Sequence, residues 1–275
     1  MKKIFLQIFL VLVYFSVSAQ RDSIRSGRQY LKNAYFPGNK KFSLEVNIGA
    51  GIPMEDYGNI SQTPFSTTDT THLNGLASLG FHFNCTASYL FSQFFGGTIM
   101  LGETLNNFNK EKWQTLRNNA VPGITTSVNG SFYIGQYLIG PYASLPVSNK
   151  VQIEFKALLG LITATYPTIT QTYPASYSVN FPTYIYGIPV TQEKAIEKST
   201  NFGYYFGTGI MYIASNHIGI NLNIGYAGSD IGYPKVTVTF SQSGYLTSSY
   251  TEYSTYTHFM QLGIFQAAAG ISYNW

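Results

Sequence analysis

The 275-residue sequence has little charge and a single cysteine. Asp, Glu, Lys and Arg together make up 10% of it, well below the roughly 25% that is usual for soluble domains. Because Cys85 has no second cysteine to pair with, a disulfide within the chain is excluded. The net charge of +4 is too small to indicate a nucleic-acid partner.

Long apolar runs are also missing after the first 19 residues. No later segment reaches the ~20 apolar residues that a membrane-spanning helix needs. Residues 1–19 combine Lys2 and Lys3, an apolar run and a small-residue stretch that ends at Ala19. This pattern predicts a secretory signal peptide, cleaved after export. Residues 20–41 are then expected to form a short basic periplasmic leader, either flexible or in contact with lipid headgroups, a periplasmic protein or peptidoglycan.

Aromatic residues and glycine are abundant, and apolar residues alternate with small or polar ones. The chain contains 23 Tyr, 20 Phe and 26 Gly. Alternation of this kind predicts β-strands with one apolar and one polar face. We find it in eight segments, near 42–50, 78–89, 94–104, 128–142, 151–161, 202–212, 218–226 and 259–275. Cys85 falls on the apolar face of the second segment, so we interpret it as a small lipid-facing side chain.

The third and fourth segments are less regular than the others. In 94–104 we expect an outward row of Phe95, Gly97, Ile99 and Leu101. In 128–142 we expect the bulkiest apolar row to face outward, namely Val128, Phe132, Ile134, Leu138 and Tyr142. Gln136 interrupts that row, and Tyr133 and Tyr137 crowd the opposite face.

The connections between the eight segments alternate in length. Three are short (90–93, 144–150 and 215–217) and four are long (52–74, 105–125, 167–200 and 228–255). Strict alternation is typical of an all-β, antiparallel up-and-down transmembrane barrel with short periplasmic turns and long external loops. The apolar faces are bulky, and the opposite faces carry Glu45, Glu154 and Lys156. A polar lumen inside a lipid-embedded barrel accepts these charges more readily than an apolar core would. We therefore predict one barrel domain over 42–275.

The whole predicted mature chain resembles the eight-stranded outer-membrane barrels of the OmpA/OmpX type, a porin-like family found in Bacteroidota-like bacteria. The resemblance rests on the signal peptide that ends at Ala19, on Gly140-Pro141-Tyr142 leading into Leu145-Pro146, and on the closing residues 270–275. It implies the outer membrane of a Gram-negative bacterium, contact with lipid and lipopolysaccharide, and insertion by the barrel-assembly machinery. A C-terminal signal read by that machinery would include Phe265, Ile271, Tyr273 and Trp275. No peptidoglycan-binding second domain is expected.

The lumen is the first candidate site. Eight strands enclose a space that side chains just fill. We expect the inward polar residues to form one network, with Lys156 between two carboxylates: Glu45, His82, Asn84, Glu154, Lys156, Asn221 and Asn223. Such a network can act as a structural plug or as a gated path for ions or protons. No cofactor or metal is implied.

The external loops are the second candidate site. Their exposed tyrosines would suit contact with a protein or a glycan: Tyr173, Tyr177, Tyr184, Tyr186, Tyr245, Tyr250 and Tyr253. The alternation of residues 236–257 predicts a hairpin raised above the membrane, whose edge can accept a partner's strand. Tyr and Thr also favour strands in a hairpin that only contacts water.

Catalysis is the rival function. Some small outer-membrane barrels are lipid-modifying acyltransferases or deacylases with a His and a Ser near the outer rim. The candidates here are His258 with Ser248, Ser249 or Ser254, and Asp230, although no strained-turn nucleophile motif is present. A metal site at His72, Asp69 and Asp56 lacks diagnostic spacing. A structural or surface-interaction role is therefore the primary prediction, with an enzyme or a narrow channel as alternatives.

Overall fold

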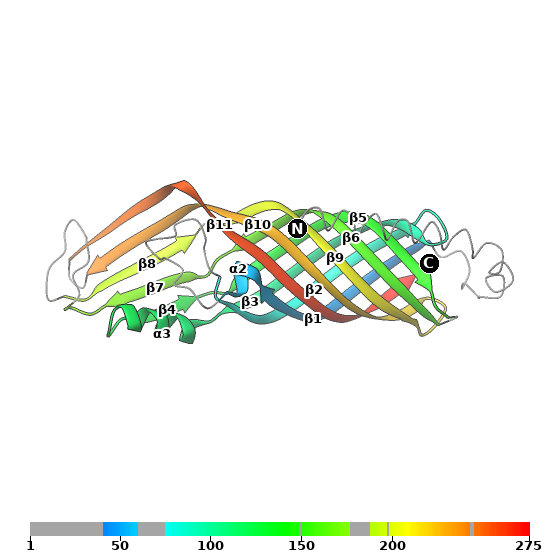
Figure 1. The fold of residues 1–275 in the computed structure, drawn as a ribbon, viewed down its shortest axis with the longest axis horizontal. Helices are drawn as coiled ribbons and strands as arrows, with labels where there is room; N and C mark the ends of the chain where they lie inside the picture. Colours follow the sequence, from blue (N-terminus) through cyan, green and yellow to red (C-terminus); the bar gives the residue numbers. More distant parts are fainter. Residues whose placement is uncertain (1–40, 60–74, 149, 177–187, 197, 243–244) are drawn as a thin grey trace.

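A closed antiparallel β-barrel forms the body of the protein (Figure 1). The computed structural model describes residues 41–59, 75–148, 150–176, 188–196, 198–242 and 245–275. Eight of the strands in these ranges form the barrel: β1 Phe42–Met54, β2 Ala77–Leu90, β3 Phe95–Phe108, β5 Phe132–Pro146, β6 Val151–Thr165, β9 Ser199–Ile213, β10 Ile218–Gln242 and β11 Tyr245–Asn274. Pairing of β1 with β11, from Ser43 opposite Asn274 onward, closes the barrel.

A second sheet projects beyond one end of the barrel. Strands β10 and β11 continue past the barrel and pair as a hairpin up to Gln242 and Tyr245, with a register shift between Tyr233 and Lys235. Three short strands extend this hairpin in the order β10–β8–β7–β4: β4 Thr125–Asn129, β7 Thr168–Tyr173 and β8 Val190–Ile196. We call these five strands the external sheet. Figure 1 shows it continuing along the long axis of the barrel.

Two helices belong to the same end of the molecule. Helix α2 (Glu55–Gly58) follows β1, and α3 (Lys110–Ala120) follows β3. The Asn109 side chain caps α3 by accepting a hydrogen bond of 3.0 Å from the Lys112 N–H. No helix among the described residues is long and apolar enough to cross a membrane, a test that does not apply to strands.

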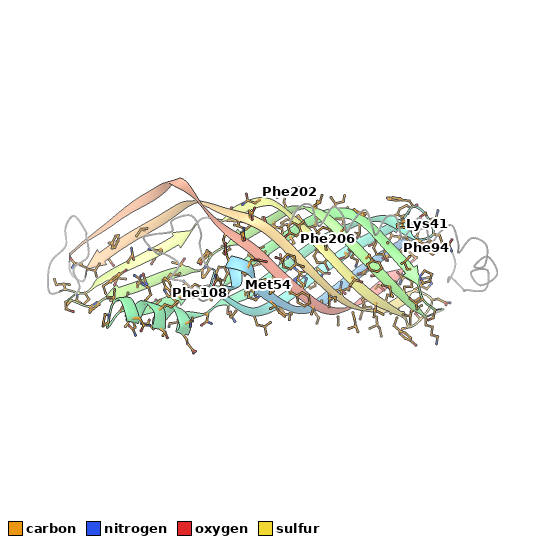
Figure 2. All side chains as sticks on the ribbon, viewed as in Figure 1. Lys41, Met54, Phe94, Phe108, Phe202 and Phe206 are labelled. Atoms are coloured by element: carbon orange, nitrogen blue, oxygen red, sulfur yellow. The ribbon has the colours of Figure 1, made fainter. Side chains whose placement is uncertain are left out.

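The outer surface of the barrel is apolar along its length. Large hydrophobic side chains that are at least a third exposed occur on all eight barrel strands, among them Leu44, Phe81, Ile99, Tyr137, Leu159, Phe206, Leu222 and Ile271. Figure 2 shows Phe202 and Phe206 on this surface, with Lys41 and Phe94 at the end that carries the short turns. Most polar side chains of the barrel face inward instead, although Glu103 lies on the outward row of β3. This arrangement is the one that a lipid-embedded barrel requires, and it confirms the predicted fold class.

The prediction for segment 128–142 was wrong in two respects. The chain leaves the strand direction at Gly130, where φ is +86°, so β4 and β5 are separate strands and Val128 lies in the external sheet. The register of β5 is also the opposite of the predicted one. Phe132, Ile134, Leu138 and Tyr142 are buried inside the barrel, whereas Tyr137 and Ile139 face outward.

The long connections are more regular than predicted. The segment 105–125 contains α3, and 167–200 contains β7 and β8, where only loops were expected. The raised hairpin predicted for residues 236–257 is confirmed by the pairing of β10 with β11 beyond the barrel, from Lys235 opposite Tyr253 to Gln242 opposite Tyr245. The predicted signal peptide and nearly all of the leader lie outside the described residues.

Candidate functional site

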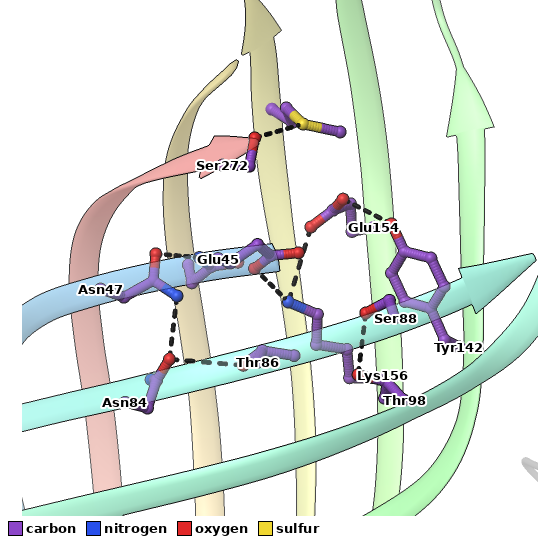
Figure 3. Close-up of polar contacts among 12 residues, drawn as sticks. Glu45, Asn47, Asn84, Thr86, Ser88, Thr98, Tyr142, Glu154, Lys156 and Ser272 are labelled. Atoms are coloured by element: carbon purple, nitrogen blue, oxygen red, sulfur yellow. Dashed lines mark hydrogen bonds and ion pairs between the residues drawn. The ribbon is translucent and has the colours of Figure 1, made fainter. Parts of the chain in front are cut away.

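A buried ion cluster lies in the lumen (Figure 3). Its residues are on the parts of β1, β5 and β6 nearer the short turns, and we call this part of the lumen the periplasmic half. The Lys156 Nζ lies 2.6 Å from Glu45 Oε2 and 3.6 Å from Glu154 Oε2. The Tyr142 hydroxyl donates a hydrogen bond of 2.6 Å to Glu154 Oε1. These four residues come from β1, β5 and β6, and each is less than 10% exposed. The cluster holds two carboxylates and one ammonium group, as predicted from the alternation.

A chain of amides lies beside the ion cluster. The Asn223 side chain donates a hydrogen bond of 3.1 Å to Asn47 Oδ1, and the Asn47 side chain donates one of 2.9 Å to Asn84 Oδ1. The side chain of Asn84 also contacts His82 Nε2 at 2.9 Å, while His82 Nδ1 lies 2.9 Å from Thr104 Oγ1. Each ring nitrogen of His82 therefore has a partner, which is the arrangement of a satisfied structural histidine. The structure thus brings six of the seven predicted lumen residues into two adjoining groups.

Asn221, the seventh residue, is fully buried without a hydrogen-bond partner among the described residues. The side-chain nitrogen and oxygen of Gln136 and of Gln266 also have no hydrogen-bond partner among the described residues. Buried amides without a protein partner are normally satisfied by internal water, so we expect water beside Asn221 and Gln266 in the polar part of the lumen. Asn47 and Tyr142 were missing from the predicted site. The inward parity of Asn47 could have identified it, whereas Tyr142 was assigned to the wrong face.

The external half of the lumen is filled by apolar side chains, which we call the apolar plug. It includes Phe132, Ile134, Leu158, Ile162 and Ile231 from the barrel wall, with Tyr57 from α2 and Trp113 from α3. The Phe132 ring packs edge-on against Tyr57 and Tyr166, with centroid distances of 5.1 Å and 4.6 Å. The plug is mainly apolar, with the buried Asn106 among its side chains, where it accepts a hydrogen bond of 3.0 Å from the Tyr57 hydroxyl.

The periplasmic end is open by comparison. A cavity of about 460 Å³ is bounded by the strand ends and short turns, with Ser88, Gln93, Ser144, Gln152, Asn216 and Asn274 in its lining. Tyr142 also lines this cavity and hydrogen-bonds to Glu154. Tyr142 therefore connects the lining of this cavity to the ion cluster.

Of the seven tyrosines predicted to be exposed on the external loops, the structure describes the side chain of one, Tyr173. Tyr173 was expected to be exposed, but it is buried on β7, where its hydroxyl accepts from Arg117 at 3.0 Å and donates to Gln192 at 3.1 Å. That expectation was wrong because residues 168–173 form a strand with a covered face. Tyr177, Tyr184 and Tyr186 lie outside the described residues. The side chains of three tyrosines on β11 are likewise not described: Tyr245, Tyr250 and Tyr253.

Three residues of the predicted C-terminal signal, Phe265, Ile271 and Tyr273, lie on β11, and Trp275 follows its last residue. Ile271, Tyr273 and Trp275 face outward with about half or more of their surface exposed, and Phe265 is partly exposed. The Trp275 ring packs against Phe42 at a centroid distance of 4.3 Å, next to the closing pair of strands.

The described residues do not include a complete set of the candidate catalytic side chains. Of the candidate group, Asp230 is exposed on β10, while the side chains of four residues on β11 are not described: Ser248, Ser249, Ser254 and His258. Asp56 accepts a hydrogen bond of 3.3 Å from the Gln261 N–H, and His72 and Asp69 lie outside the described ranges. Within those ranges, no group of three or more His, Cys, Asp or Glu side chains could hold a metal ion.

Comparisons with known proteins give remote structural likenesses. No protein-family model and no curated protein matches the chain. Among solved structures, it is similar to the attachment invasion locus protein Ail of Yersinia pestis, with 13% identity, a TM-score of 0.38, and 85% of this chain and 98% of that chain covered. A major outer membrane protein from Thermus thermophilus gives 10% identity, a TM-score of 0.41 and coverage of 86% and 100%. The outer membrane protease OmpT from Escherichia coli gives 7% identity and a TM-score of 0.41, with 87% of this chain and 98% of that chain covered.

Proposed function

We propose that this protein is a non-conducting outer-membrane barrel that anchors the external sheet and presents it to a partner at the cell surface. The observation that supports the proposal is the apolar plug, a cluster of buried side chains in the lumen beneath the external sheet. A pore would need a hydrated path through both halves, and eight strands leave little room for one. The barrel therefore serves as a support, and the part available for recognition is the part that projects beyond it.

An outer-membrane location in a Gram-negative bacterium is part of this proposal. It is supported by the apolar outer surface and by the outward aromatic residues at the end of β11. Deletion of residues 273–275 should leave the protein degraded or stranded in the periplasm, because the last strand could then neither be recognised by the assembly machinery nor close fully against β1. Normal outer-membrane abundance of the truncated protein would contradict the proposed signal.

Conductance tests the closed lumen. The purified wild-type protein, inserted in planar bilayers, should show no steady current at physiological salt. A steady, large conductance would overturn the proposal and favour the channel alternative. Mass spectrometry of the surrounding lipid A, with and without the protein, tests the enzyme alternative, because an acyltransferase or deacylase changes the mass of its lipid substrate.

The supporting role of the barrel can be separated from recognition by excising the raised hairpin. Tyr233 pairs with His258, so residues 234–257 can be replaced by a two-residue Asn-Gly turn that suits this register. The variant should still insert as a closed, non-conducting barrel. Affinity purification from the native outer membrane, in mild detergent, should then recover partners with the wild-type protein that the variant lacks. Identical recovery by both proteins would contradict a recognition role for the hairpin.

A further inference from the structure

The two faces of the external sheet differ in chemistry. One face carries buried side chains, including Ile169 and Tyr173 of β7, Val190 of β8, and Val238 and Phe240 of β10. Ile169 belongs to the same buried cluster as Phe132 and Ile162 of the apolar plug. This face therefore continues the interior of the barrel, and the opposite face continues its outer surface.

On β4, β7, β8 and β10, nine of the twelve outward positions carry a hydroxyl group. Strand pairing places them in three cross-strand rows. Two rows run from β4 through β7 and β8 to β10, namely Ser127–Thr170–Glu193–Thr239 and Thr125–Thr172–Thr191–Ser241, and the third consists of the two pairs Asn129–Thr168 and Ala195–Thr237. We call these twelve positions the hydroxyl face. All twelve side chains are partly or largely exposed, and the Thr172 and Thr191 hydroxyls lie 3.3 Å apart across the strands.

The composition of this face limits what it can bind. None of the twelve positions is Lys or Arg, and one is Glu. Phosphate groups are normally bound by cations or by clustered backbone N–H groups, so a phosphorylated ligand is disfavoured. The twelve positions also include no Tyr, Trp or Phe, which supply most of the contact area in tight recognition sites. Hydroxyls both donate and accept hydrogen bonds, and they complement the hydroxyls of an uncharged sugar.

The position of the face indicates where such a sugar comes from. It continues the outer surface of β6 and β10 beyond their lipid-facing residues Leu161 and Leu222. In an outer membrane, the layer directly beyond the lipid is formed by the saccharides of the outer-leaflet glycolipid. We propose that the hydroxyl face binds the uncharged saccharide part of the glycolipid in which the barrel is embedded. This inference deepens the proposed function, on which it rests, by naming one surface and one class of partner.

Weak individual contacts are sufficient for this partner. A hydrogen bond that replaces one to water contributes only about 0.5–1.5 kcal/mol, too little for a few hydroxyls to hold a free glycan. The glycolipid is confined to the same leaflet, so its sugars are present at a high effective concentration. Several such contacts can then hold them against the sheet.

The test compares two triple variants at the same positions. Thr170, Thr237 and Thr239 are changed either to Val, which keeps the β-branched shape and loses the hydroxyl, or to Ser, which keeps the hydroxyl and loses the methyl group. The full-length proteins are reconstituted in nanodiscs that contain equal amounts of lipopolysaccharide with a complete core saccharide and lipopolysaccharide truncated to its innermost sugars. Native mass spectrometry measures which glycolipid remains bound to each protein.

The wild type and the Ser variant should retain the complete glycolipid over the truncated one. The Val variant should lose about tenfold of this preference, the effect of three modest hydrogen bonds. An effect on strand stability alone would weaken the Ser variant instead, because Val favours strands more than Ser does. Equal preference in all three proteins, or an equal loss in both variants, would overturn the inference. Neither result would alter the conductance or the hairpin-excision experiment, so the proposed function can fail or stand independently.

Discussion

The two halves of the lumen show how one barrel wall can enclose two kinds of interior. In the periplasmic half, Glu45, Glu154 and Lys156 form a buried ion cluster. In the external half, Phe132 and Ile162 are fully buried in the apolar plug. The outer surface does not change in the same way, since it is apolar alongside both halves.

Strand β6 contains this change within a single element. Its inward side chains are Glu154 and Lys156 at the periplasmic end and Leu158 and Ile162 toward the external end. Its outward side chains remain apolar throughout, because lipid surrounds both halves. The stability of the polar half thus depends on ion pairs, hydrogen bonds and hydration, whereas the stability of the external half depends on apolar packing. Substitutions of the same kind should therefore have different effects in the two halves.

Phe132→Ala should cause the largest loss of stability. Phe132 is fully buried at the centre of the apolar plug, where it contacts Tyr57 and Tyr166. Truncating such a ring costs about 3–5 kcal/mol, because it removes apolar burial and leaves a cavity. Phe206→Ala is the matched control, since Phe206 faces lipid and lipid can fill the space left. Denaturant unfolding from lipid vesicles measures both, and equal losses would contradict a packed plug.

Lys156→Met should be the next most damaging change. It leaves Glu45 and Glu154 in a narrow site without their common cation. Removing one member of a buried pair costs about 3–5 kcal/mol, and we expect the lower end because we expect water in this half. Adding Glu45→Gln should recover more stability than adding Glu154→Gln. Glu45 makes the shorter contact with Lys156, and Glu154 keeps its bond from Tyr142. Absence of any recovery in the double variants would show that the three groups are not coupled.

Leu222→Arg tests whether the outer surface of β10 faces the hydrocarbon of the membrane. Leu222 faces outward on β10, between the two ends of the apolar surface. A charge near mid-bilayer costs about 2–4 kcal/mol in a membrane barrel. Leu222→Ala keeps the position apolar and should cost far less. Equal unfolding free energies for the two variants in lipid vesicles would mean that this position does not face the hydrocarbon.

The sequence was sufficient to predict the barrel because lipid imposes one rule on every strand. Alternation identified the outward rows of seven of the eight predicted segments, including Ile218 to Tyr226. It failed in 128–142, where both rows are bulky and the inward one belongs to the apolar plug. Bulk therefore no longer distinguished lipid from interior. The break at Gly130 depends on a positive φ, which the alternation does not reveal.

The contents of the lumen were only half predictable for a related reason. Polar residues at inward positions, such as Glu45 and Lys156, are conspicuous in a chain with so few charges. The apolar plug draws Tyr57 and Trp113 from short helices in segments that had been predicted as loops. Such contacts depend on how connections fold back over the barrel mouth, which periodicity along a strand does not specify.

Gln136→Met should have the smallest effect on the free energy of unfolding. Whether it raises or lowers that free energy indicates where the polar half of the lumen meets the apolar plug. Gln136 is fully buried between the inward Ile134 and Leu138, and neither of its amide atoms has a described hydrogen-bond partner. An unpaired buried amide costs about 1–3 kcal/mol, so a similarly sized apolar side chain should leave stability within about 1 kcal/mol of the wild type or raise it. Asn47→Leu, the matched change in the polar half, should destabilise, because it leaves Asn84 and Asn223 without their partner. If Gln136→Met is as harmful as Asn47→Leu in vesicle unfolding, water must bind Gln136 firmly. The hydrated half would then extend along β5 beyond Leu138, and the apolar plug would begin only at Ile134.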